Sequence, residues 1–232
     1  MTLAVEGVAA GYGERNIIEN INFSVEPGKI MALFGHNGAG KSTILKTLLG
    51  LIPVTEGSIT LDSNRIEKKG VTDRVSHGLR LLPEGRGVFP ELTVGENLNV
   101  VAAANPPKGG AHISTDDVMT LFPMLRERRN ALAGAMSGGQ QQQLALGLSV
   151  IGQPKCLLLE EPSVGLQPDL VEHLFAQIST TCKELGVCAI LIEHKIASAM
   201  KIVDDVLIIN SGEVVFYGSN AEACKTDMWK YF

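Results

Sequence analysis

Apolar positions in the first fifty residues change from the short runs of strands to the longer period of a helix. The segment "IENINFSVEPGKIMALFG", residues 18–35, predicts a strand, a turn at Pro27-Gly28 and a second strand over residues 30–34. In "KSTILKTLLGLIP", residues 41–53, the apolar side chains fall at helical spacing, and a Gly and a Pro supply the stop signals. A strand therefore leads through a short glycine-rich turn directly into a helix.

The middle of the chain has a helical pattern, and its last third returns to strands. Residues 93–148 contain "TVGENLNVVAAA" and "STDDVMTLFPMLRERRNALAGAMS", which predict helices separated by the loop "NPPKGGAH". Buried-strand patterns follow at "KCLLLE", "VCAILIE", "DDVLIIN" and "EVVFYGS", with a helix pattern between the first two. Strands alternating with helices favour an α/β fold with a mostly parallel sheet, which carries its ligands at the C-terminal ends of the strands.

Composition restricts the function classes. The formal net charge of -5, without clusters of Lys and Arg, argues against direct binding of nucleic acid. The N-terminal "MTLAVEGVAAGYGERN" lacks the pattern of an export signal, and no run approaches 18 consecutive apolar residues. Any role at a membrane is therefore expected to depend on a partner.

The four cysteines show no C-x-x-C spacing. In a chain of this length without an export signal, such cysteines are typical of buried thiols in a reducing compartment. Two of them, Cys182 and Cys188, have His173 and His194 in the same third of the chain. Scattered Cys and His residues of this kind are mostly core or surface residues, so we do not expect them to bind a metal.

The glycine-rich turn "GHNGAGKST", residues 35–43, matches the phosphate-loop pattern G-x-x-x-x-G-K-[ST]. Its glycines allow successive backbone N–H groups to curl around a phosphate, and the start of the helix adds partial positive charge. We expect Lys41 to reach the terminal phosphates and the Ser42 hydroxyl to ligate Mg²⁺. The predicted nucleotide-binding residues of the loop are Gly35, His36, Asn37, Gly38, Ala39, Gly40, Lys41, Ser42 and Thr43. No N-K-x-D stretch follows a strand, which disfavours GTP as the nucleotide.

Two neighbouring carboxylates end the strand predicted at "LLLEE", residues 157–161. Adjacent acids repel each other unless a cation or solvent relieves them. If this strand lies parallel to the strand before the phosphate loop, Glu160 reaches the Mg²⁺ through bound water, and Glu161 faces the attacking water as base or positioning group. The two acids are therefore expected to do different jobs.

The segment "MSGGQQQQLALG", residues 136–147, predicts a helix start with Ser137 as N-cap, followed by Gly138, Gly139 and Gln140. The two glycines allow close approach of the backbone, so this helix start is suited to hold a second γ-phosphate. Together with the phosphate loop and "LLLEEP", the segment resembles the signature motif of the ATP-binding subunits of ABC transporters.

The resemblance covers essentially the whole chain and implies the architecture of that family. It implies a single nucleotide-binding domain over residues 1–232 with a P-loop NTPase core, an N-terminal antiparallel β region and an inserted helical subdomain. The ATP-binding core is expected at residues 1–92 and 156–232, and the helical subdomain with the signature motif at about 93–155. It also implies a head-to-tail pair of ATPase subunits, in which each signature acts on the ATP bound to the opposite subunit.

Further positions match the family one by one. Tyr12 in "GYGERN" is similar to the aromatic residue that stacks on adenine. Glu84 in "LLPEGRGVFPELTVGEN" lies in the loop that senses the γ-phosphate and its Mg²⁺ and faces the membrane subunit. His194 in "LIEHK" is similar to the switch histidine that contacts the γ-phosphate. "PSVGLQPD", residues 162–169, resembles the loop that touches the opposite subunit.

Four positions depart from the family pattern. Glu160 stands where Asp is usual for the metal-linked acid, and Glu84 stands where Gln is usual, which adds negative charge near the phosphates. Met136 replaces the usual Leu of the signature, a swap that conserves volume. Gln167 stands where many members have Asp.

"PEGRGVFPELTV" and "EPSVGLQP" resemble the subset that serves uptake of branched-chain amino acids and urea, although many members of one ATPase type of that subset have Gln where this chain has His194. The resemblance implies an ATPase on the cytoplasmic face of the membrane, bound to integral permease subunits and working with an extracytoplasmic solute-binding protein. The second ATPase subunit is either another copy or a different chain. An ABC ATPase of another transporter type, a non-transport ABC ATPase and a low-turnover regulator stay open as alternatives.

Overall fold

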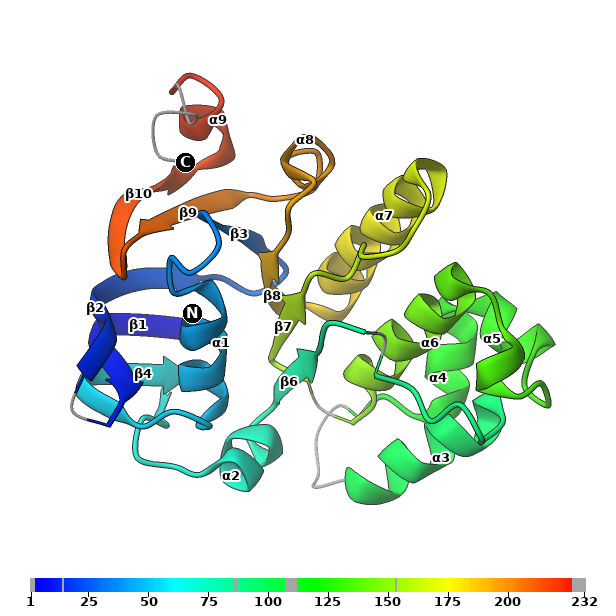
Figure 1. Ribbon diagram of the computed structural model, residues 1–232. Helices are drawn as coiled ribbons and strands as arrows, with labels where there is room; N and C mark the ends of the chain where they lie inside the picture. Colours follow the sequence, from blue (N-terminus) through cyan, green and yellow to red (C-terminus); the bar gives the residue numbers. More distant parts are fainter. Residues whose placement is uncertain (1–2, 14, 86, 107–111, 153, 227–232) are drawn as a thin grey trace.

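Two β-sheets and two groups of helices make up the computed structural model, which describes residues 3–13, 15–85, 87–106, 112–152 and 154–226 (Figure 1). The strands are β1 Leu3–Tyr12, β2 Arg15–Val25, β3 Ile30–Phe34, β4 Val54–Leu61, β5 Asn64–Arg65, β6 Leu79–Leu82, β7 Cys156–Glu160, β8 Cys188–Ile192, β9 Asp205–Asn210 and β10 Glu213–Ser219. The helices are α1 Lys41–Leu49, α2 Val71–Ser76, α3 Val94–Ala104, α4 Thr115–Leu121, α5 Pro123–Glu127, α6 Gly138–Val150, α7 Pro168–Leu185, α8 Ile196–Ala199 and α9 Asn220–Ala223, with a 3-10 turn at Ala133–Ala135.

The larger sheet has the strand order β10-β9-β3-β8-β7-β6, and the smaller sheet has the order β2-β1-β4-β5. Within the larger sheet, strands β9, β3, β8, β7 and β6 are parallel to their neighbours, and β10 alone pairs antiparallel with β9. The smaller sheet is antiparallel throughout. Both features confirm the predicted α/β fold with its mostly parallel sheet and antiparallel N-terminal region.

The buried residues of the central strands alternate between two cores, as the two-residue period of a strand requires. Met31 and Leu33 of β3 pack with helix α1 and the antiparallel sheet. Ala32 and Phe34 belong to the second core, which also contains α7 and the helical region. The larger sheet is therefore covered on both faces, and its central strands are continuously apolar for that reason.

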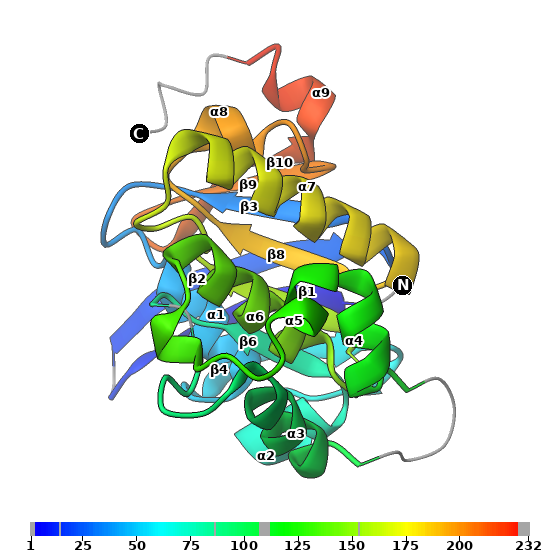
Figure 2. The ribbon, with the colours of Figure 1, turned by 90° about the vertical axis from the view of Figure 1, so that its right-hand side faces the viewer.

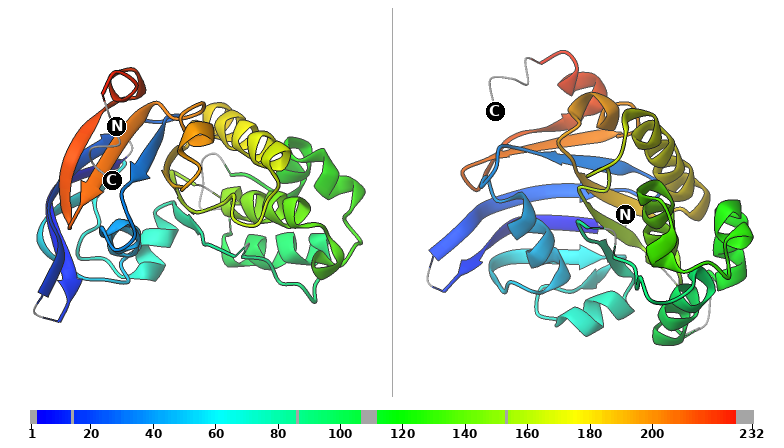
Figure 3. Two further views of the ribbon diagram at one scale, coloured as in Figure 1. Left: turned by 45° about the horizontal axis from the view of Figure 1, so that its top comes forward. Right: turned by 45° about the vertical axis from the view of Figure 1, so that its right-hand side comes forward.

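Helices α3, α4, α5 and α6 gather beyond the β6 edge, while α7 runs along one face of the larger sheet (Figures 2 and 3). Pro123 divides the segment predicted as one helix: α4 ends at Leu121 and α5 begins at Pro123, since proline is accepted at the first helical position but not inside a helix. Capping boxes at Thr93 and Ser114 set the starts of α3 and α4.

Two sequence predictions were wrong about exposure. The pattern "EVVFYGS" forms a strand, β10, but it is an edge strand rather than a buried one, and its Val215 and Tyr217 are exposed. Cys224 is also exposed, whereas Cys156, Cys182 and Cys188 are buried free thiols as expected. Burial raises the pKa of the Cys182 thiol to about 12, which keeps it protonated.

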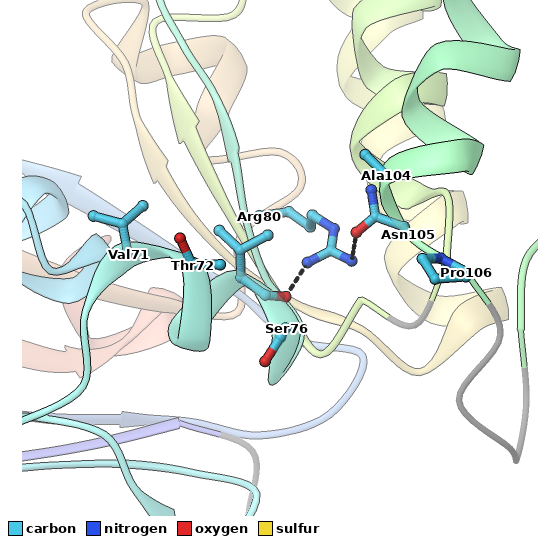
Figure 4. Close-up of a pocket in the computed structure, with 9 residues that line it drawn as sticks. Val71, Thr72, Ser76, Arg80, Ala104, Asn105 and Pro106 are labelled. Carbon is cyan, nitrogen blue, oxygen red and sulfur yellow. Dashed lines mark hydrogen bonds between the residues drawn. The ribbon is translucent and has the colours of Figure 1, made fainter.

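Arg80 on β6 joins the end of α2 to the end of α3 across a hollow of about 510 Å³ (Figure 4). Its guanidinium donates to the carbonyls of Val75 and Leu79 and, at 2.8 Å, to the side-chain oxygen of Asn105. Asn105 in turn donates to the Val101 carbonyl at 2.9 Å. One arginine thus ties the first helix of the helical region to the edge of the larger sheet.

Candidate functional site

The phosphate loop follows β3 and leads straight into α1, with Gly40 as the N-cap of the helix in the left-handed region at φ 110. A Cβ atom at Gly40 would lie 2.8 Å from Ile18 Cγ2, so both the conformation and the packing require glycine. Because this cap has no side chain, the first N–H groups of α1 are not capped by one. They are left to bind an anion.

Lys41 lies across the loop that it follows. Its Nζ donates to the carbonyls of Gly35 at 2.7 Å and His36 at 3.0 Å, and the residue is 7% exposed. Burial lowers the pKa of Lys41, and the nearby charge of Glu161 partly opposes that shift. The ammonium group is therefore fixed over the loop with carbonyl oxygens as its hydrogen-bond partners.

The two neighbouring acids at the end of β7 have different partners. Ser42 Oγ donates to Glu160 Oε1 at 2.8 Å, which connects the start of α1 to β7. Glu161 Oε1 lies 2.9 Å from His194 Nε2, in the loop after β8. The backbone explains the divergence: Glu161 has φ 46, and its amide donates to the Ile192 carbonyl at 3.0 Å. Chain direction changes between the two acids, so their carboxylates separate.

A hollow of about 420 Å³ opens over the phosphate loop, and its lining brings several predicted site residues together. Tyr12, Lys41, Ser42 and Glu161 are among the residues that line it. The Tyr12 side chain is 57% exposed, so its ring has a free face for a ligand. Ile17 on β2 also lines the hollow. The sequence did not indicate this residue, because an aliphatic side chain in a strand pattern is expected in the core and has no group that marks a binding site.

The signature segment lies at a different hollow, of about 400 Å³, which Ser137, Gly139, Gln140 and residues of α7 line. Ser137 is the N-cap of α6, and a capping box with Gln140 completes it: each residue's backbone N–H donates to the other's side chain, at 3.0 and 3.4 Å. The chain therefore does not bring its own signature to its own phosphate loop.

Glu84 is exposed, and no hydrogen bond or ion pair joins it to another residue that the structure describes. The loop that contains it is held at its other end by Asn97, which is fully buried on α3. Asn97 accepts from the Phe89 amide at 2.8 Å and donates to the Phe89 carbonyl at 3.0 Å. Sequence analysis missed Asn97, because a polar residue inside a helical pattern is usually a surface residue.

Two kinds of feature are absent from the described residues. These residues contain no cluster of three or more His, Cys, Asp and Glu side chains arranged to hold a metal ion. Nor does any described helix have both the length and the apolar character needed to span a bilayer.

Comparison with known proteins identifies the family. The family model described as "ABC transporter" matches residues 18–164. The chain is 36% identical over 219 residues to the high-affinity branched-chain amino acid transport ATP-binding protein BraG of Pseudomonas aeruginosa, covering 94% of this chain and 93% of the relative. It is 33% identical over 213 residues to the probable branched-chain amino acid transport ATP-binding protein LivF of Archaeoglobus fulgidus, covering 92% of this chain and 90% of the relative.

Solved structures agree on the fold. A dimeric ATP-binding cassette in a post-hydrolysis state, bound to ADP and Pi, superposes with a TM-score of 0.77 at 20% identity, covering 94% of this chain and 98% of that one. The family match, the two relatives and this fold confirm the resemblance seen in the sequence: the chain belongs to the ABC transporter family, as one of its ATP-binding proteins.

Proposed function

We propose that this protein binds and hydrolyses ATP as a subunit of an importer for branched-chain amino acids or a related small polar solute. The observation that carries the hydrolytic part is the separation of the two acids, with Glu160 on Ser42 and Glu161 on His194. This arrangement supplies an oxygen-rich metal position and a distinct carboxylate–imidazole pair beside one phosphate loop.

The Ser42 hydroxyl and the Glu160 carboxylate are the hard oxygen groups that Mg²⁺ prefers. Since Glu160 reaches Ser42 within 2.8 Å, its extra methylene relative to Asp does not carry it out of range. Bound there, Mg²⁺ would neutralise charge on the phosphates during phosphoryl transfer. Glu84 completes the proposed metal-linked set, although the structure gives it no contact with Ser42 or Glu160.

Glu161 is the proposed catalytic group of this chain. Its carboxylate orients the attacking water and accepts its proton, while His194, hydrogen-bonded to it at 2.9 Å, holds the carboxylate and contacts the γ-phosphate. The Lys41 ammonium group offsets the negative charge of the terminal phosphates. Tyr12 stacks on the adenine from the rim of the same hollow.

The separate position of Ser137, Gly138, Gly139 and Gln140 supports a pair of ATPase subunits, in which this helix start faces the ATP of the partner. The solved cassette of similar fold, which is dimeric with ADP and Pi bound, supports the pairing itself. We further propose that residues 1–92 and 156–232 form the ATP-binding core and about 93–155 the helical subdomain. The pair would act at the cytoplasmic face of the membrane on integral permease subunits, supplied by an extracytoplasmic solute-binding protein.

Uptake by the native cell tests the importer and its solute directly. The chromosomal copy is changed to Lys41→Ala, with Lys46→Ala, an exposed lysine of the same helix, as the matched control. We expect uptake of labelled leucine, isoleucine and valine to fall by at least about tenfold in Lys41→Ala only, because the phosphates lose their counter-charge. Normal uptake of all three, beside a loss of ribose or urea uptake, would reassign the solute, and unchanged uptake of every solute would contradict an import role.

A further inference from the structure

Glu193 is a buried carboxylate that the proposed chemistry does not use. It lies directly after β8 and directly before His194, and it is 4% exposed. Burying an ionised group costs free energy unless hydrogen bonds compensate it. The hydrogen-bond partners of the Glu193 carboxylate therefore indicate which segments it positions.

All of its hydrogen bonds in the described part of the chain come from backbone amides. Glu193 Oε1 accepts from the amides of His194 at 2.9 Å and Lys195 at 3.2 Å. Glu193 Oε2 accepts from the amide of Ser163 at 3.3 Å. Ser163 is two residues beyond Glu161, so a single carboxylate holds the backbone beside both members of the Glu161–His194 pair.

Lys195 closes the arrangement from the same loop. Its Nζ donates to the carbonyls of Ser163 at 3.2 Å and Leu166 at 3.3 Å. Ser163 is thus held through both its N–H and its C=O group, while its own buried hydroxyl has no partner among the described residues. The segment is shaped by its own backbone bonds, from Val164 N–H to the Glu161 carbonyl at 3.1 Å and from Leu166 N–H to the Ser163 carbonyl at 3.2 Å. Glu193 and Lys195 add the side-chain bonds that tie it to the loop of His194.

We infer that Glu193 and Lys195 form a clamp of two positioning residues for ATP hydrolysis. The clamp fixes the loop of His194 against the segment 162–166, so that the Glu161 carboxylate and the His194 imidazole keep their separation. The segment lies within residues 162–169, which the family resemblance leads us to expect at the opposite subunit, so the clamp would link that contact to the catalytic pair. This inference rests on the proposed ATPase function.

The clamp is tested by steady-state hydrolysis of Mg-ATP with the purified full chain and three variants. Glu193→Gln turns one acceptor oxygen into a donor that faces an amide, and Lys195→Met keeps the stem but removes the bonds to Ser163 and Leu166. Lys201→Met is the matched control, since its exposed Nζ pairs with Glu172 at 2.9 Å and touches neither loop.

We expect kcat to fall about 10- to 100-fold in Glu193→Gln and several-fold in Lys195→Met, because a displacement of about 1 Å at a reacting group has effects of that size. KM and the affinity for a fluorescent ATP analogue should stay within about twofold, and Lys201→Met should match the wild type. The double variant should be no slower than Glu193→Gln, since the two residues act on one segment. Unchanged kcat, equal losses in nucleotide affinity, or effects that multiply in the double variant would overturn the clamp.

Amide hydrogen exchange tests the clamp without any measurement of ATP hydrolysis. It therefore separates this inference from the proposed function. In Glu193→Gln, the amides of Ser163, His194 and Lys195 should exchange at least about tenfold faster, with the melting temperature and the exchange of β3 amides unchanged. Absence of wild-type turnover would count against the proposed function alone. Unchanged protection of those three amides would overturn the clamp whatever the turnover.

Discussion

At the scale of single residues, the most informative position is Glu160, where the family usually has Asp. The longer side chain still reaches Ser42, with an Oγ to Oε1 distance of 2.8 Å. Glu84 departs differently, because it adds a charge where the family usually has Gln, and it lies exposed without a bonded partner in the described chain. Of these two departures, only Glu160 is therefore held beside the phosphate loop, at the proposed metal position.

Removing the charge of Glu160 should change the metal requirement of hydrolysis. In Glu160→Gln we expect the Mg²⁺ concentration for half-maximal turnover to rise at least about tenfold, whereas Glu160→Asp should stay within a few-fold of the wild type, because it keeps the carboxylate. Titration of turnover with Mg²⁺ at saturating ATP measures both. An unchanged Mg²⁺ requirement in Glu160→Gln would show that this carboxylate does not serve the metal.

The exposed ring of Tyr12 should contribute to nucleotide affinity. Stacking of an aromatic ring on a base contributes about 1–3 kcal/mol, so Tyr12→Ala should raise the Kd for ATP roughly 5- to 150-fold, and Tyr12→Trp should largely preserve it. Equilibrium binding of ATP in the absence of turnover measures the effect. A Kd unchanged in Tyr12→Ala would place the base elsewhere.

At the scale of elements, the parts predicted from the sequence are those with strong periodicity or a specific motif. The turn from β3 into α1 and the strands β7, β8 and β9 follow from apolar runs beside glycine and charged residues. The sequence analysis assigned no element to α2 or β6, which have six and four residues and are too short to show a period. β10 was predicted to be a buried strand because its residues are mostly apolar. Its exposure follows from its place at the edge of the larger sheet, which the apolar pattern does not reveal.

Long-range side-chain contacts could not be predicted either, because they depend on which elements the fold brings together. Arg74 on α2 is the clearest case. It is 1% exposed and donates to the carbonyls of Thr47 at 2.6 Å and Leu48 at 2.8 Å, in the last turn of α1. It also donates to the carbonyls of Lys69 and Glu67, both at 2.8 Å. A cation at a helix C-terminus is favourable, and here it also satisfies buried carbonyl groups.

Loss of this arginine should therefore destabilise the fold. Arg74→Met should lower the free energy of unfolding by about 2–4 kcal/mol, since several buried acceptors lose their donor. Arg126→Met, at an exposed arginine that donates to the Thr120 hydroxyl at 3.0 Å, should change it by less than about 1 kcal/mol. Urea denaturation of both variants gives the comparison, and equal stability of Arg74→Met and wild type would refute the role of Arg74.

At the scale of the whole molecule, the phosphate loop and the signature helix start lie at separate hollows of the same chain. Each is half of the site that the family resemblance implies. In the proposed arrangement a second subunit completes each ATP site, and the proposed Glu193–Lys195 clamp connects the segment expected at that contact with Glu161. Hydrolysis should consequently depend on association.

The concentration dependence of phosphate release tests this account most directly. Steady-state release from Mg-ATP is measured over a wide range of concentrations of the purified chain, beside Glu161→Gln, which removes the proposed base while preserving the shape of the side chain. We predict release that rises more steeply than in proportion to protein concentration and falls at least about 100-fold in the variant. Release strictly proportional to concentration, or a Glu161→Gln variant as active as the wild type, would contradict the account.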